Sequence, residues 1–429
     1  MEKLRHVSRR QNLGAMYARK ISAVLVLILC AQLFTISASA ASAGVGGITS
    51  RGAIVMDFES GEVLFEHNAD VRRAPASMTK MMTVYMVLDA VDRGVISLDT
   101  RVPISEFAHE FSRRPGETNV ALTRTRHYTV SQLLDVSIIM SASGASVALA
   151  ELVGNGSRHN FFRMMTARAN YWGIDAVFHS ASGGSTHTFM SPRAMAEITR
   201  NTILRFPEVL ERTAMTSVTF HGRTYHSTNR LLGVYEGIDG FKTGSNSVAL
   251  ENFSGTAARG DVRIITVTMG SNWGRRFADT EILMNYGFNT MMERRMIPPT
   301  SSPILINGEI VEFEAYFIGG SNYFRIRDLA YALNGTASQF NVQWDSEFHA
   351  VALTSETAYI AVGGELSPGS GESVIPAVLN ARIIFDGEEV ALDAYNIGGS
   401  TFFRLRDIMT LVGAEVAFDS ASGIISITA

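Results

Sequence analysis

An internal duplication in the last third of the chain is the feature that most constrains its fold. Residues 318–328 recur as residues 397–407, with each aligned pair separated by 79 positions. Each copy reads as two short strands, a short helix and two further strands. A unit this small buries too little apolar surface to fold alone. We therefore expect the copies, about residues 303–354 and 380–429, to pack together as one small α/β module.

Three prolines, Pro298, Pro299 and Pro303, mark the boundary before this module, which leaves residues 44–298 as a separate domain. Within that domain, strand patterns stand at both ends and helical periodicity fills the middle. The expected strands are 53–58, 63–65, 249–256 and 262–269, and the expected helices are 78–91, 131–153, 160–172, 192–203 and 276–292. This order predicts an α+β domain in which helices cover an antiparallel sheet made from both ends of the segment.

The first 43 residues have the pattern of a secretory signal peptide. A basic stretch precedes an apolar run over residues 21–36, and A-x-A sequences follow at 38–40 and 41–43. The alternative, a retained membrane anchor, is disfavoured because the run is short for a spanning helix. We expect export to the cell wall or the outer face of the cytoplasmic membrane. The leader carries six basic groups and one acid, so its removal changes the formal charge from −4 to −9, which argues against nucleic-acid binding.

Cysteine and histidine usage narrows the chemistry further. The only cysteine, Cys30, lies in the leader, so the mature chain has no disulfide, thiolate nucleophile or cysteine-ligated zinc. The ten histidines show no spacing typical of metal ligands. The sequence therefore predicts neither a metal site nor a cofactor.

The sequence Ser77-Met78-Thr79-Lys80 is the first candidate catalytic motif. Residues three apart share one face of a helix, so Lys80 can reach the Ser77 hydroxyl and act as its base. Pro75 suits a helix entry, where the backbone N–H groups favour a developing anion. Alone, this pair is more typical of an ordinary exposed helix start than of a catalytic site.

Two further motifs complete a possible site. Lys242-Thr243-Gly244, beside a strand, offers a cation and a hydroxyl to a substrate carboxylate and leaves room for an extended peptide. Ser141-Ala142-Ser143 lies on a helical stretch, where Ser141 could pass a proton between the base and a leaving amine. Read singly, the first is a lysine in a turn and the second a small-residue helix contact.

Together, the S-x-x-K, S-x-S and K-T-G motifs, in this order, resemble the low-molecular-mass penicillin-binding proteins, the serine-type D-Ala-D-Ala carboxypeptidases of peptidase family S11. The flanking sequences at residues 74–80, 148–151, 229–233 and 237–244 carry the same resemblance, which covers about residues 47–292. It implies a β-lactamase/transpeptidase-like fold. It also implies removal of the terminal D-alanine from peptidoglycan stem peptides, a role in wall biogenesis and cell shape, and covalent inhibition by β-lactams.

By the same resemblance, Ser77 is the nucleophile, Lys80 the general base and Ser141 the proton relay. Lys242, Thr243 and Arg276 would hold the substrate carboxylate beside Gly244. The backbone N–H groups of Ser77 and Ser245 would form the oxyanion hole. The positive charge of Lys242 would help to lower the pKa of Lys80.

One departure from the family pattern concerns Ser143, which stands where the family has an asparagine that donates to the substrate amide. A shorter donor weakens substrate positioning, although Asn246 could compensate. This leaves open a catalytically weakened, wall-binding homologue. A serine β-lactamase is a third reading, but no segment resembles that family's acidic loop.

The duplicated module resembles stalk repeats related to the N-terminal domain of copper amine oxidases, although His349 is its only histidine. The resemblance suggests contact with a cell-wall polymer or a spacer role. Paired charges recur in both copies, and we expect them to be structural pairs at helix starts rather than ligand-binding groups. They are Arg325, Arg327 and Asp328, and Arg404, Arg406 and Asp407.

Overall fold

The computed structural model describes residues 45–185, 187–300, 304–367, 371–420 and 422–429, so the predicted leader lies outside the described residues. The chain divides into two compact units between Phe288 and Asn289. This division falls inside helix α9 (Arg276–Arg295), ten residues before Pro298, where the sequence places the domain boundary. The final turns of α9 therefore belong to the second unit.

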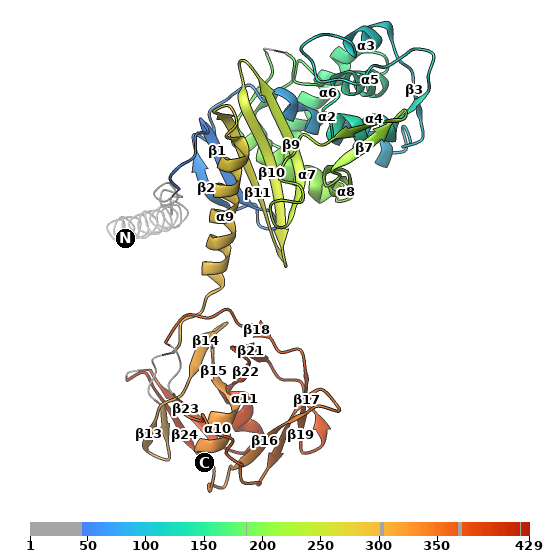
Figure 1. Cartoon of the computed structure of the whole chain (residues 1–429). Coiled ribbons are helices and arrows are strands. Elements are labelled where there is room, and N and C mark those ends of the chain that lie inside the picture. The colour runs from blue at the N-terminus through green and yellow to red at the C-terminus, as the bar shows by residue number, and fades with distance from the viewer. Residues whose placement is uncertain (1–44, 186, 301–303, 368–370, 421) are drawn as a thin grey trace, which may run out of the picture. The chain divides into compact units, whose positions relative to one another are not determined.

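The first unit is built on a five-stranded antiparallel sheet in the order β2-β1-β11-β10-β9 (Figure 1). Its strands are β1 (Gly52–Asp57), β2 (Val63–His67), β9 (Ile238–Asn246), β10 (Leu250–Arg259) and β11 (Val262–Ser271). Strand β1 pairs with β11, with Ile54 opposite Val267, so both ends of the segment meet in one sheet as expected. Strand β9 forms one edge of the sheet.

Helices cover both faces of this sheet. They are the short 3-10 helix η1 (Ala76–Thr79), α2 (Lys80–Asp92), α3 (Glu106–Phe111), α4 (Val130–Ile138), α5 (Ser143–Val153), α6 (Arg158–Tyr171), α7 (Pro192–Arg205), α8 (Val209–Thr213) and α9. Alternate residues of β10 show the two faces: the Ser254 hydroxyl lies 2.8 Å from Thr199 Oγ1 of α7, whereas the next residue, Gly255, faces Met284 of α9. The α+β architecture is confirmed. No helix in the described part of the chain is both long and apolar enough to cross a bilayer.

Short two-stranded pairs complete this unit: β3 (Arg101–Val102) with β4 (Tyr128–Thr129), β5 (Ala176–Val177) with β6 (Phe189–Met190), and β7 (Ser217–Phe220) with β8 (Arg223–His226). The expectation of one helix over residues 131–153 is wrong, because α4 ends at Ile138 and α5 begins at Ser143. Ser141 between them has a φ of +68°, a left-handed conformation that no α-helix accommodates. The apolar pattern runs through this break because both helices lie in the core: α4 buries Leu133, Leu134 and Ile138, and every residue of α5 from Ser143 to Ala150 is buried.

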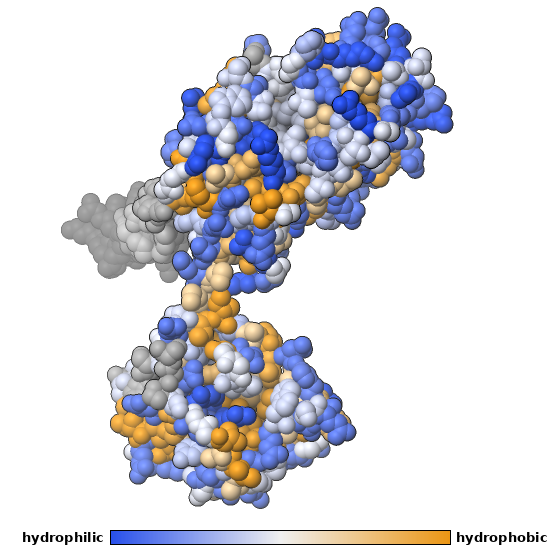
Figure 2. Space-filling view, in the orientation of Figure 1, coloured by the Kyte–Doolittle hydropathy of each residue, from blue (hydrophilic) through white to orange (hydrophobic). Residues whose placement is uncertain are grey.

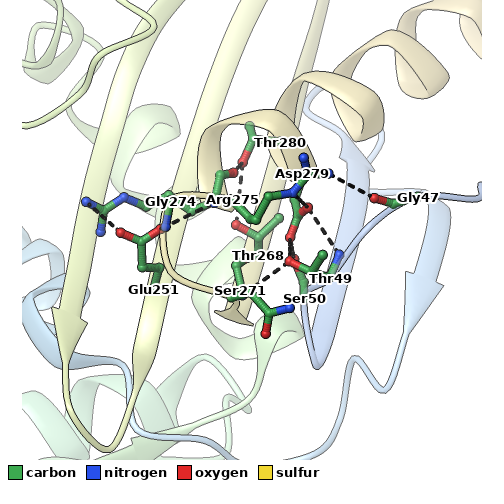
Figure 3. Close-up of polar contacts among 12 residues, drawn as sticks. Gly47, Thr49, Ser50, Glu251, Thr268, Ser271, Gly274, Arg275, Asp279 and Thr280 are labelled. Carbon is green, nitrogen blue, oxygen red and sulfur yellow. Dashed lines mark hydrogen bonds and ion pairs between the residues drawn. The ribbon is translucent and has the colours of Figure 1, made fainter.

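A buried carboxylate fastens the start of the first unit to α9 (Figure 3). Asp279 is fully buried and accepts hydrogen bonds from the Thr49 backbone N–H and hydroxyl, at 3.1 and 2.9 Å, and from the Ser50 hydroxyl, at 2.7 Å. Ser50 Oγ also lies 2.8 Å from Ser271 Oγ at the end of β11. Because burying an unpaired charge is costly, these contacts fix the register between the chain start, the sheet and α9.

The second unit contains both copies of the duplication. The first copy comprises β12 (Ile304–Ile306), β13 (Glu309–Val311), β14 (Ala315–Ile318), β15 (Ser321–Arg325), α10 (Ile326–Ala332), β16 (Phe340–Asp345) and β17 (Ala350–Ser355). The second follows β18 (Ala377–Val378) and comprises β19 (Arg382–Phe385), β20 (Glu388–Glu389), β21 (Ala394–Ile397), β22 (Ser400–Arg404), α11 (Leu405–Leu411), β23 (Glu415–Asp419) and β24 (Ile424–Thr428). Four strands, not the expected two, precede each helix, because a turn at Gly308 or Gly387 folds the first segment into a hairpin of its own.

The two copies exchange strands, which confirms that they pack together. Strand β12 of the first copy pairs in parallel with β24 of the second, and β17 pairs in parallel with β19. The central pair is β15 with β22, where Phe324 stands opposite Phe403, its own equivalent 79 residues later. Both phenylalanines belong to one core that draws on both copies. Neither copy has a complete sheet or core without the other.

Candidate active site

Ser77 lies on η1, the tight turn that leads into α2. The preceding residue, Ala76, has a φ of +49°, a conformation that costs energy for a residue with a β-carbon. Met78 is fully buried, and the Thr79 hydroxyl donates to the Ala76 carbonyl at 2.9 Å. Core packing therefore holds the strained turn and leaves Ser77 half-buried at the helix start, as is typical of functional strain.

Lys80, one turn further on, is fully buried and has three polar neighbours. Its Nζ lies 2.8 Å from Ser77 Oγ, 3.2 Å from Ser143 Oγ and 2.9 Å from the Ser182 carbonyl oxygen. A neutral amine has two N–H donors, which suit the Ser182 carbonyl and the Ser143 hydroxyl. Its lone pair can then accept the Ser77 O–H. This is the arrangement of a nucleophile with an adjacent base.

The electrostatics favour that neutral form. Burial lowers the pKa of Lys80 from 10.5 to about 7, and the Glu117 carboxylate opposes the shift. Burial is the largest cause of this lowering. The expected repulsion between Lys80 and Lys242 is present and disfavours the charged form of both, and the pKa of Lys242 is held well below its usual value by burial first and then by Lys80 and Arg276.

The two serines of the middle motif have different surroundings. Ser143 begins α5 and is the one that contacts Lys80. Ser141, held in its left-handed conformation, has a buried Oγ without a hydrogen-bond partner in the described part of the chain. Gly144 must be small, because a methyl group there would stand 2.6 Å from Ser112 Cβ. The hydroxyl of Ser141 is thus free to bind a group that enters the site.

Strand β9 brings Lys242, Thr243 and Gly244 against the nucleophile. A methyl group on Gly244 would stand 3.0–3.1 Å from the backbone nitrogens of Met78 and Ser77 and 2.5 Å from the Pro75 carbonyl oxygen. Only glycine lets the strand approach this closely. Lys242 is almost fully buried, and its one hydrogen bond within the described chain goes to the adjacent Thr243 carbonyl at 3.1 Å.

Arg276, at the start of α9, reaches the same strand. Its Nη1 donates to the Gly244 carbonyl at 3.4 Å, and Glu251 of β10 forms an ion pair with it at 3.6 Å. Glu251 also accepts from the Gly274 N–H at 2.8 Å, which ties it to the turn before the helix (Figure 3). The Arg276 Nε is buried and has no partner in the described structure. Two cations therefore face the carboxylate position predicted beside Thr243.

Other predicted residues lie apart from this cluster or have other partners. Ser245 follows Gly244 on β9 and is exposed. Asn246, considered as a substitute for the missing asparagine, is exposed, and its Oδ1 caps the next turn by accepting from the N–H groups of Val248 and Ala249. Asn246 therefore does not supply the side-chain amide that is missing at position 143.

The sequence analysis did not identify the loop at residues 180–185 as part of the site. Gly183 packs so tightly that a methyl group would stand 1.8 Å from the Ala76 carbonyl oxygen, and its φ is +90°. Its neighbour Ser182 supplies the carbonyl bound by Lys80. Gly184 lies against Glu117, with 3.1 Å between its hypothetical methyl group and Oε1. The small-residue run at 180–185 was a signal for a close backbone approach, whereas nothing in the sequence pointed to Glu117.

These contacts place the first unit in the transpeptidase-like class of serine acyl-transfer enzymes, in which one buried lysine serves as the base of a helix-start serine. No group of three or more His, Cys, Asp or Glu residues in the described ranges could hold a metal ion.

Comparisons with known proteins identify the family. The profile of the D-alanyl-D-alanine carboxypeptidases, peptidase family S11, matches residues 37–272. The chain is 28% identical over 284 residues to D-alanyl-D-alanine carboxypeptidase DacF of Bacillus subtilis, an alignment that covers 63% of this chain and 71% of DacF. It is 33% identical over 247 residues to DacC of Escherichia coli, with 56% of this chain and 62% of DacC covered. The chain therefore belongs to the D-alanyl-D-alanine carboxypeptidase family.

Solved structures agree with this assignment. Penicillin-binding protein D2 of Listeria monocytogenes, in its ampicillin-bound form, aligns with a TM-score of 0.52 and 33% identity over 56% of this chain and 98% of that one. Penicillin-binding protein 6B of Escherichia coli aligns with a TM-score of 0.54 and 30% identity, covering 56% and 78%. The transpeptidase-like fold is confirmed.

Proposed function

We propose that this chain removes the terminal D-alanine from peptidoglycan stem peptides through an acyl-enzyme on Ser77. The observation that carries the proposal is the 2.8 Å contact between Ser77 Oγ and Lys80 Nζ, together with a Lys80 pKa of about 7. A lysine with that pKa is substantially neutral near physiological pH, so it can accept a proton. Most lysines are protonated there and cannot.

In the acylation step, Lys80 takes the hydroxyl proton while Ser77 Oγ bonds to the carbonyl carbon of the penultimate D-alanine. The bond from that carbon to the nitrogen of the terminal D-alanine then breaks. The leaving amine takes the proton from Lys80 through the Ser141 hydroxyl, whose buried and unpartnered position supports a relay. Water next cleaves the ester, which releases the shortened stem and restores the Ser77 hydroxyl.

The substrate carboxylate supplies an anion for Lys242, whose only hydrogen bond in the described residues goes to the Thr243 carbonyl, beside Arg276, which Glu251 already pairs. Lys242 and Arg276 both have a pKa lowered chiefly by burial, so a bound carboxylate favours their charged forms. The free edge of β9 allows the stem peptide to lie alongside as an extra strand. The substrate carbonyl would then sit near the backbone N–H groups of Ser77 and Ser245, which form the oxyanion hole.

The position of Ser143 supports an active enzyme rather than a binding-only homologue. Its hydroxyl completes the set of three partners around Lys80, so the base remains positioned although the amide side chain is missing. The missing amide would have donated to the substrate, so its absence weakens the positioning of the substrate and not that of the base. The named relatives are carboxypeptidases, so a β-lactamase is not favoured.

Three expectations from the sequence remain part of this proposal. The leader would direct export, so that the enzyme works in the cell wall or at the outer face of the cytoplasmic membrane. β-Lactams would acylate Ser77, in keeping with the ampicillin-bound and cefotaxime-bound forms of the Listeria relative. The duplicated unit would contact a cell-wall polymer.

The test combines labelling by a fluorescent penicillin with release of D-alanine from a soluble pentapeptide stem. The parent should do both, whereas Ser77→Ala should lose labelling and reduce release by about 10⁴-fold or more. Thr125→Ala, which removes an exposed hydroxyl away from the site, serves as the matched control. The proposal fails if Ser77→Ala, still folded by circular dichroism, releases D-alanine at the parent rate.

A further inference from the structure

Two grooves in the second unit are each lined by parts of both copies of the duplication. The first, of about 540 Å³, lies between the start of α10, strand β16 and the β21–β22 turn, and it includes Arg327, Trp344 and Asn396. The second, of about 590 Å³, lies between the start of α11, strand β23 and the β14–β15 turn, and it includes Arg406 and Phe418. Both have the volume of ordinary ligand sites.

The grooves are equivalents under the internal duplication. Arg327 and Arg406 are 79 residues apart, as are the two turns, although each turn belongs to the opposite copy. Trp344 and Phe418 are 74 residues apart, because five residues are missing between helix and strand in the second copy. Each groove therefore combines the helix start of one copy with the strand turn of the other copy, and the two grooves are lined by equivalent residues.

The charge pairs divide in a way that the sequence did not predict. Arg325 pairs with Asp328 at 2.9 Å, and Arg404 pairs with Asp407 at 2.7 Å, so these are structural pairs as expected. Arg382, the remaining arginine and one that lines neither groove, pairs with Glu389 at 2.6 Å.

Arg327 and Arg406 differ from these three. Residues 304–429 contain sixteen Asp and Glu, five Arg and no Lys. Even so, the guanidinium groups of Arg327 and Arg406 are exposed and make no ion pair or hydrogen bond within the described residues. With acids so abundant, two unpaired arginines at equivalent positions in two grooves indicate cations kept available for a ligand.

Each free arginine shares its groove with an exposed aromatic side chain. Trp344 is 50% exposed in the first groove, and Phe418 is 61% exposed in the second. Side-chain amides, Gln343, Asn380 and Asn396, add donors and acceptors to the first. Figure 2 shows hydrophobic and hydrophilic surface intermixed over this unit rather than one continuous apolar face. Aromatic faces beside amides suit the apolar faces and polar edges of sugar rings.

From this geometry we propose that the two grooves bind a carbohydrate polymer that carries spaced carboxylates, one segment in each groove. A dense polyanion is disfavoured, because the surrounding sixteen acids would repel it. Isolated carboxylates can each pair with one guanidinium. Two equal grooves suit a ligand that repeats, since a second segment binds at high effective concentration once the first is held. The inference rests on the proposed function and deepens it, because stem peptides are attached to a polymer of this kind through its carboxyl groups, and each position without a stem leaves a free carboxylate.

The test uses the full chain carrying Ser77→Ala, so that the probe is not consumed. Two probes are used: purified peptidoglycan sacculi, and glycan strands from which an amidase has removed the stem peptides. The groove variant carries Arg327→Ala, Trp344→Ala, Arg406→Ala and Phe418→Ala. The control carries Arg382→Ala and Phe348→Ala, which remove an arginine and an aromatic ring of similar exposure outside the grooves.

We expect the groove variant to lose at least tenfold in co-sedimentation with sacculi and the control to match the parent. Variants of one groove alone should fall between them, because bivalent binding is lost. Stripped glycan strands should compete with sacculi for the parent. Equal binding by groove variant and parent, an equal loss in the control, or no competition by stripped strands would each overturn the inference.

The proposed function is scored separately by D-alanine release from a soluble pentapeptide, measured with Ser77 intact. A parent that binds glycan through the grooves but releases no D-alanine would refute the proposed carboxypeptidase activity and would still support glycan binding by the grooves. Melting curves and circular dichroism identify any variant that fails to fold. For such a variant, Arg327→Gln with Arg406→Gln replaces the alanine set, and unchanged binding by that variant overturns the inference.

Discussion

The two units differ in how completely a buried charged side chain is hydrogen-bonded. In the active site of the first unit, Lys242 is buried with a lowered pKa and has one hydrogen bond in the described residues, to the Thr243 carbonyl, which leaves its other N–H groups open. In the second, the buried Asp328 is satisfied by Arg325 at 2.9 Å and by the Leu366 N–H at 3.0 Å. A buried charge that is paired maintains a fold, whereas one left incomplete is a place where a substrate can complete it.

Unpartnered atoms follow the same division. Four buried side-chain atoms lack a hydrogen bond in the described residues, and all belong to the first unit. Two of them, Ser141 Oγ and Arg276 Nε, are in the candidate active site. Ala76 and Ser141 also have positive φ angles next to the reacting groups. The catalytic unit therefore carries strain and desolvation where its chemistry occurs, and the duplicated unit places its free cations on the surface.

The largest effect expected from this comparison is that of Lys80→Met. Removing the base should lower acylation by about 10²- to 10⁴-fold. Replacing a buried amine with an apolar side chain of similar size should leave the melting temperature unchanged or raise it, because its desolvation cost disappears. Fluorescent-penicillin kinetics and calorimetry measure the two quantities. A variant that loses both activity and stability would show that Lys80 also stabilises the fold. The two units would then not differ in the role of their buried charges.

The matched change in the second unit should act on stability. Asp328→Ala leaves Arg325 without its closest carboxylate and should lower the free energy of unfolding by about 3 kcal/mol. Its equivalent Asp407→Ala, at a site 20% exposed, should lower it by about 1 kcal/mol. Hydrogen exchange in peptides from residues 304–429 during denaturation measures both. Equal losses would mean that burial does not distinguish the two copies.

The smallest expected effect concerns pH. The acylation rate should rise as pH increases through about 7, because only neutral Lys80 accepts the Ser77 proton. The Glu117 carboxylate raises the pKa of Lys80, so Glu117→Gln should move the midpoint of this rise to lower pH. The control is Glu110→Gln, an exposed glutamate in the preceding helix, which should leave the midpoint in place. A midpoint that stays or moves upward in Glu117→Gln would contradict the assignment.

Much of this protein could be predicted from local sequence. Ser77 and Lys80 meet because residues three apart share a helix face, and the hairpins at both ends of the first unit follow from apolar runs separated by polar turns. The 79-residue period shows that two copies must share a core. Three motifs in order indicate the family, since each specifies a local geometry that any fold of this class must present.

Other features could be seen only after folding. Ser143 rather than Ser141 contacts Lys80 because Ser141 breaks the helix, and a backbone conformation of that kind leaves no mark in apolar periodicity.

The convergence of Ser182 and Glu117 on the lysine depends on packing between loops far apart in the chain. The burial that gives Lys80 its pKa is likewise a property of the whole core. The sequence alone thus determined which reactive groups the chain carries and which neighbours they have along one helix or strand. Tertiary structure alone decided which groups lose water and which remain unpaired, because desolvation and pairing depend on every segment that packs around them.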